Sequence, residues 1–172
     1  MTPLVSQLWP QFMADPDFAA SFGRVIVEHA RMLRQERQVV FTLRSAAPLD
    51  KGLCARLLAS LAPDYEGFEL RIHNLFGYAA LDESGLRELM EEMKRDGVPI
   101  NGFLDRCRIT ITGQNITIGV CHGTKFLQEM QFERLLAERI AAHTGVKPKV
   151  TLESSVGEAE QRQMEEKLER KI

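Results

Sequence analysis

The chain has 172 residues, 44% of them hydrophobic, and its 22 basic and 24 acidic side chains leave a formal net charge of -2. This composition is typical of one medium or two small globular domains. The near-neutral balance excludes a general attraction for nucleic acid or an anionic membrane, so only a local patch can provide one. No apolar run approaches the roughly 20 residues that span a bilayer, and no secretory signal pattern opens the sequence. Three cysteines, an odd number, favour a reducing compartment. We therefore expect a cytoplasmic protein without a membrane partner.

The first half of the sequence predicts a helix near residues 5–12 and a turn with a helix cap at Asp15-Pro16-Asp17. A hairpin follows, with strands within 23–33 and 38–43. Asp50 is then expected to cap a helix that runs to about Leu61, and a strand is expected over 68–73.

The second half begins with an amphipathic helix over 81–96 that ends at Gly97. Residues 108–112 and 115–120 alternate polar and apolar side chains on either side of Gly113-Gln114, which predicts a β-hairpin. A helical region over 123–143 changes its apolar phase near Gln131, so we expect two consecutive helices there. A last strand is expected over 147–152. The expected buried face of the hairpin consists of Ile109, Ile111, Ile116, Ile118 and Val120.

Both halves therefore read as helix, hairpin, helix and strand. This order predicts an α+β protein with two small domains, 1–76 and 80–155, each with a three-stranded sheet, and a charged helix over 156–172 that leads to a following domain. Residues 54–59 and 132–137 occupy the same place in the two halves, which indicates an internal repeat. The second domain has the order of a type II KH-like domain. KH domains bind single-stranded nucleic acid through a Gly-x-x-Gly loop between two helices, and no such loop occurs near Gln131.

Residues 97–104 (GVPINGFL) and 109–118 (ITITGQNITI) resemble the N-terminal region of PolC, the Gram-positive-type DNA polymerase III α subunit. The resemblance covers about residues 22–171 and rests on pattern and element order. It implies a non-catalytic N-terminal module of a DNA-directed DNA polymerase, a nucleotidyltransferase with 3'-5' exonuclease activity that acts in DNA replication. It also implies that the second domain is similar to the polymerase-binding domain of the clamp-loader τ subunit. The implied partners are replisome proteins such as the τ subunit or the helicase.

The residues that could act in catalysis or metal binding have ordinary structural explanations in this sequence. Asp15 and Asp17 fit a turn and a helix cap, and the four histidines are scattered without a neighbouring nucleophile and acid. Cys107, Cys121, His122 and His143 can be assembled on paper into a zinc site, but no C-x-x-C pair supports it. We therefore predict no catalytic, metal or cofactor-binding residue and no cofactor. An independent small enzyme is the weakest alternative.

The residues that alternate with the buried positions are the candidates for binding a partner protein. A second group, the arginines around the first hairpin, is the one local basic excess, but no aromatic residues alternate with these arginines to stack bases. We expect at most weak DNA binding from this group; a single-stranded nucleic-acid-binding module of KH type remains the alternative function. The predicted interaction surface is Arg44, Arg71, His73, Thr110, Thr112, Thr117 and Thr151, and the predicted weak phosphate contacts are Arg24, Arg31, Arg34 and Arg37.

Overall fold

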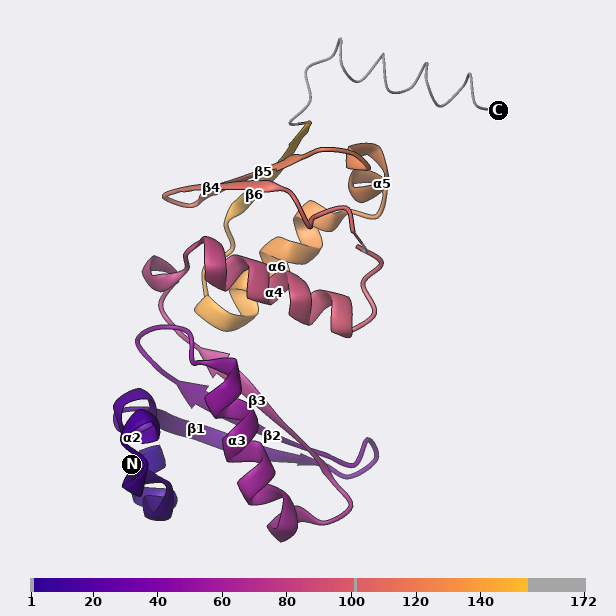
Figure 1. Ribbon diagram of the computed structural model, residues 1–172. Helices are drawn as coiled ribbons and strands as arrows, with labels where there is room; N and C mark the ends of the chain where they lie inside the picture. The colour runs from indigo at the N-terminus through magenta and orange to yellow at the C-terminus, as the bar shows by residue number, and fades with distance from the viewer. Residues whose placement is uncertain (1, 101, 155–172) are drawn as a thin grey trace. The chain divides into compact units, whose positions relative to one another are not determined.

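The computed structural model describes residues 2–100 and 102–154 (Figure 1). The chain divides into two compact units, one made of Met1–Leu81 with His143–Gly145 and the other of Asp82–Ala142 with Val146–Ile172. Each unit has its own three-stranded sheet, in the orders β1-β2-β3 and β4-β5-β6. The predicted α+β class with two small sheets is thereby confirmed. The charged helix expected over 156–172 lies outside the described residues.

The first unit opens with three short helical segments: α1 (Val5–Leu8), the 3-10 helix η1 (Pro10–Ala14) and α2 (Pro16–Phe22). The single helix expected over 5–12 is therefore wrong. Pro10 disfavours the helical conformation in the residue before it, and Trp9 has φ -131° and ψ 63°. The cap expected at Asp15 is confirmed, because its Oδ1 accepts a hydrogen bond from the Asp17 backbone N–H at 3.0 Å.

The first sheet consists of β1 (Ile26–Leu33), β2 (Gln38–Arg44) and β3 (Glu69–Leu75). β2 pairs antiparallel with β1 and parallel with β3, so the chain crosses over between β2 and β3. That crossover contains α3 (Lys51–Leu61) and the 3-10 helix η2 (Ala62–Tyr65), and α3 lies across one face of the sheet (Figure 1). Asp50 caps α3 as predicted. The core between helix and sheet consists of buried residues that include Val39, Phe41, Leu43, Leu57 and Leu61.

After the 3-10 helix η3 (Tyr78–Ala80), the second unit has the element order helix, hairpin, two helices and strand. The break expected near Gln131 is confirmed, since Gln131 separates the two helices with a positive φ of 61°. β5 pairs antiparallel with β4 and parallel with β6. The elements are α4 (Glu83–Arg95), β4 (Arg108–Thr112), β5 (Asn115–Val120), α5 (Thr124–Glu129), α6 (Phe132–Thr144) and β6 (Lys149–Ser154).

The apolar face of the second sheet is buried on the central strand and less so on β4. Ile116, Ile118 and Val120 are fully buried, whereas Ile109 and Ile111 are only half-buried. The expectation that these five residues form one buried face is therefore confirmed for the three residues of β5 and wrong for the half-buried Ile109 and Ile111. β4 is an edge strand with one neighbour, so its side chains receive less cover than those of β5.

Helices α4 and α6, which Figure 1 shows on the same side of the second sheet, are joined by an ion-pair network. Arg139 of α6 donates hydrogen bonds to Glu92 Oε1 at 2.9 Å and to Asp96 Oδ2 at 2.7 Å. Partial burial alone would lower the pKa of Arg139, but the two carboxylates outweigh this effect and raise it. Removing Arg139 would therefore leave two carboxylates close together without their shared cation.

Truncating these side chains to alanine should lower the free energy of unfolding by different amounts at buried and half-buried positions. Phe41→Ala and Ile118→Ala each empty a fully packed site, and we expect each to lower the free energy of unfolding by about 2–5 kcal/mol. Ile111→Ala should cost clearly less, because its side chain already meets solvent. Urea unfolding followed by circular dichroism measures the three values. Equal losses at positions 111 and 118 would contradict the edge position of β4.

The pH dependence of stability should report the ion pair between Asp15 and Arg56. The hydrogen bond from Arg56 lowers the pKa of Asp15; partial desolvation opposes this, and the backbone N–H groups of Phe18 and Asp17 add to it. Because the pKa of Asp15 is lower in the folded than in the unfolded protein, its ionised carboxylate stabilises the fold at pH values above its ordinary pKa. This stabilisation is lost as the pH falls through the folded-state pKa. Asp15→Asn keeps an N-cap but cannot ionise, so its deficit relative to wild type should shrink from about pH 6 to about pH 3. Urea unfolding at both pH values measures this, and a deficit independent of pH would rule it out.

Candidate functional site

The predicted interaction residues of the second unit lie side by side on the open face of its sheet. Thr110 on β4 pairs with Thr117 on β5, and Thr117 pairs in turn with Thr151 on β6. Thr112 begins the adjacent row, opposite Asn115. The four threonines are exposed or half-buried, while the opposite face of the same strands carries the buried core. The register thus aligns the hydroxyl and methyl groups of Thr110, Thr117 and Thr151 in one row. Arg108 and Glu153 lie in the row on one side and Lys149 in the row with Thr112 on the other, and we call this surface the threonine face.

The predicted interaction residues of the first unit are less concentrated. Arg44 donates to Glu28 Oε1 at 2.6 Å, and Arg71 donates to Glu69 Oε1 at 3.3 Å. The ring of His73 lies 4.6 Å from the ring of His143, centroid to centroid. All three residues therefore already have partners within the unit, and a binding role would require their competition with these contacts.

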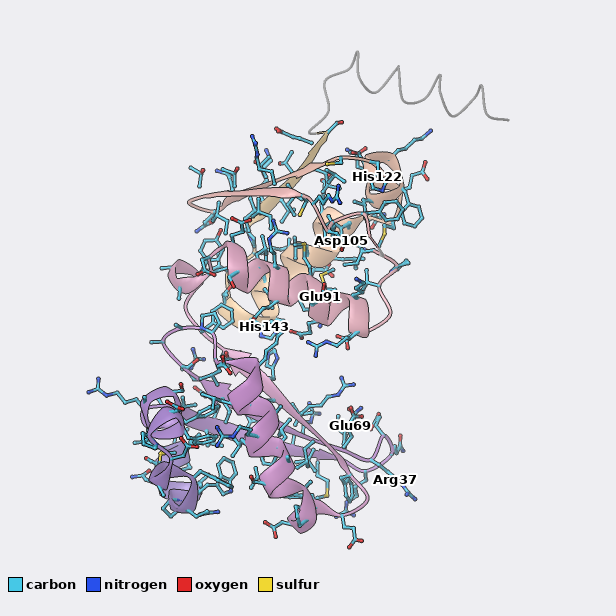
Figure 2. The ribbon with its side chains drawn as sticks, viewed as in Figure 1. Arg37, Glu69, Glu91, Asp105, His122 and His143 are labelled. Atoms are coloured by element: carbon cyan, nitrogen blue, oxygen red, sulfur yellow. The ribbon has the colours of Figure 1, made fainter. Side chains whose placement is uncertain are left out.

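The four arginines predicted to meet phosphates do not form one track. Arg24 precedes β1, whereas Arg34 and Arg37 lie in the turn after it, at the far end of an eight-residue strand that is roughly 25 Å long. The backbone oxygen of Arg37 accepts a hydrogen bond from the Glu69 N–H at 2.8 Å, so an acidic side chain lies at the same end of the sheet (Figure 2). The structure brings Arg34 and Arg37 together but separates them from Arg24; Arg31 lies within β1.

The cysteines and histidines do not gather into a metal site. Among the described residues, no three His, Cys, Asp or Glu side chains are placed to hold a metal ion. Cys107 is buried, and this burial raises the pKa of its thiol, although the Arg87 guanidinium partly opposes the effect. Arg87 donates to the Cys107 backbone oxygen at 2.8 Å and has its Nη1 3.7 Å from the sulfur. The raised pKa keeps the thiol protonated at neutral pH.

A shallow groove of about 350 Å³ lies between α4 and the segment before β4. Its floor is formed by the buried side chains of Met90, Ile100 and Leu104. Two of its polar residues, Glu91 and Asp105, are labelled in Figure 2. The other two, Arg87 and Lys94, balance their charge, so the groove has no net preference for an anion or a cation.

An aromatic cluster that sequence reasoning missed lies beside the second hairpin. The ring of Phe103 lies 5.6 Å from that of His122 and 5.2 Å from that of Phe126, between centroids. Gly123 permits this approach, because a Cβ at position 123 would lie 2.2 Å from Phe103 Cδ1. The backbone φ of 81° at Gly123 also favours glycine. Phe126 is 42% exposed. The sequence carries no local signal for this cluster, because the whole hairpin separates Phe103 from His122 and Phe126.

No protein-family model, curated protein or solved structure matches the chain. None of the helices in the described ranges combines the length and apolar character that crossing a bilayer requires.

The three cysteines should differ in how fast their thiols react. Cys107 is buried with a raised pKa, whereas Cys54 and Cys121 are half-buried. In the folded protein at about pH 7.5 we expect iodoacetamide to alkylate Cys107 at least about tenfold more slowly than the other two, because its thiolate is scarce and shielded. Peptide mass spectrometry over time measures the three rates, and urea-unfolded protein is the control. Preferential labelling of Cys107 would contradict its described surroundings.

Proposed function

We propose that this chain is a non-catalytic N-terminal module of a PolC-type replicative DNA polymerase and that it holds replisome proteins together. The threonine face is the observation that carries the proposal. Two of its three strands form the hairpin whose sequence resembles the PolC N-terminal region, and the register aligns Thr110 and Thr117 of that hairpin with Thr151 of β6. An exposed sheet face that carries no ionised group along its central row suits contact with a second protein surface.

The proposed partners follow from the resemblance and are the clamp-loader τ subunit and the replicative helicase. Cytoplasmic localisation and a role in DNA replication belong to the same proposal. The interaction surface consists of the threonine face, to which Arg44, Arg71 and His73 add a second, more polar region on the first unit. Their existing ion pairs and ring contact make that region the weaker contributor.

Binding of single-stranded nucleic acid is the second candidate, on the ground of element order. The order α4-β4-β5-α5-α6-β6 is that of a type II KH-like domain. At the junction of α5 and α6, however, a positive φ falls on Gln131 rather than on a glycine. A Gly-x-x-Gly clamp on the nucleic-acid backbone is therefore not available there.

Isothermal titration calorimetry with purified τ subunit and purified helicase tests the first candidate. We expect the chain to bind at least one of them, and Thr110→Lys to weaken that binding about tenfold because a long charged side chain prevents close packing. The same change should alter the free energy of unfolding by no more than about 0.5 kcal/mol, since residue 110 is exposed.

Ser21→Lys, at an exposed position of α2, is the matched control and should bind like wild type. The proposal fails if neither protein binds. It also fails if Thr110→Lys and Ser21→Lys bind equally well, because the threonine face would then lie outside the interface.

A further inference from the structure

We propose that the aromatic cluster of Phe103, His122 and Phe126 binds the unpaired bases of single-stranded nucleic acid. This site goes beyond the proposed protein-interaction function and does not depend on it. It also differs in place from the loop between α5 and α6 on which KH domains rely, since its residues come from the segment before β4 and from the turn and helix after β5.

The geometry of the cluster provides a stacking surface. Phe103 packs against the backbone of Gly123 with His122 and Phe126 beside it, the ring planes being inclined by 55° and 34°. His122 and Phe126 are exposed, and Phe103 is half-buried. One ring is thus anchored while two retain faces that a base can cover, and base–aromatic stacking is tolerant of sequence because every base has a π face.

Basic residues outnumber acidic ones in the two segments that build the cluster. Residues 102–108 and 119–126, the two segments that build it, contain the basic residues Arg106, Arg108 and Lys125 and the acidic residue Asp105, a net charge of +2 for the two segments, and Glu129 follows one helical turn after Phe126. The two segments lie side by side, because the Cys121 thiol donates to the Arg106 backbone oxygen at 3.9 Å and Arg108 is in register with Gly119. Lys125 lies between His122 and Phe126 in the sequence. Cations next to stacking rings are what a single-strand backbone requires.

An apolar protein segment would be a poorer occupant of this surface. It would cover the rings of Phe103 and Phe126 but would place apolar groups against the cations of the adjacent segments, whose desolvation would then go uncompensated. A nucleic-acid strand satisfies both features, since its bases meet the rings and its phosphates meet the cations. In the first unit, by contrast, the arginines of the hairpin turn have no comparable ring cluster beside them among the aromatic contacts of the described residues.

Fluorescence anisotropy with the full chain and fluorescein-labelled single strands of roughly 12 nucleotides tests the proposal. The probes are oligothymidylate, oligouridylate and an abasic deoxyribose-phosphate strand of the same length, at about 50 mM salt. We expect at least one pyrimidine strand to bind and the abasic strand to bind on the order of tenfold more weakly, because it cannot stack. Tighter binding of oligouridylate assigns the site to RNA, and tighter binding of oligothymidylate assigns it to DNA.

Two pairs of variants locate the binding. Phe126→Ala should weaken binding on the order of tenfold, whereas Leu8→Ala, which removes a side chain of similar exposure from α1, should not. Lys125→Gln should weaken binding and reduce the slope of log affinity against log salt by about one, whereas Arg95→Gln, at an exposed position of α4, should leave both unchanged. Circular dichroism confirms folding, and since residues 125 and 126 are both exposed, either variant alone suffices for the test.

Four results would overturn the proposal. They are the absence of binding by every strand at up to about 100 µM protein, equal affinity for the abasic strand, unchanged affinity of Phe126→Ala, and loss of binding in a further variant, Arg34→Gln, instead of in Lys125→Gln. The last result would assign the phosphates to the arginines of the first hairpin. None of these results bears on calorimetry with replisome proteins, which probes residue 110.

Discussion

The parallel pairing of the last strand with the central strand is the constraint on which each unit depends. β3 can lie parallel to β2, and β6 parallel to β5, only if the intervening chain returns to the starting end of the sheet, and that return needs a dozen or more residues. In both units the return is helical, with α3 in one and α5 and α6 in the other. The helix of a crossover packs on one face and buries it. The opposite face then consists of the alternate side chains, which is why the threonines form a surface at all.

Much of this arrangement follows from local sequence. The hairpin of β4 and β5 is predictable because its period of two is unbroken and because Gly113, with a φ of 57°, supplies the turn. The helix α3 is predictable from Asp50, whose side chain satisfies the Leu53 N–H that the first turn leaves open. The division of the last helical region near Gln131 is likewise visible as a change of apolar phase. These features depend on residues close together in the chain.

The remaining features depend on contacts between distant segments. Ile111 has the same pattern as Ile118, and only its place on an edge strand leaves it half-buried. The register shift of β1 between Val27 and His29 is set by pairing with β2 and has no local sequence mark. The threonine row forms only because β6 pairs with β5 in the observed register. The aromatic cluster forms only because segments on either side of the hairpin approach each other. Periodicity therefore identified outward-facing residues but not their neighbours.

The strand order also has a consequence for how the chain folds as it is synthesised. In each sheet the hairpin is local and closes within microseconds, whereas the parallel strand pairs across a long intervening segment and forms later. The edge of β2 stays unpaired until β3 has left the ribosome, and the edge of β5 stays unpaired until β6 has done so. The two halves thus present such an edge at different times, which limits mispairing between β2 and β5, strands of the same alternating type.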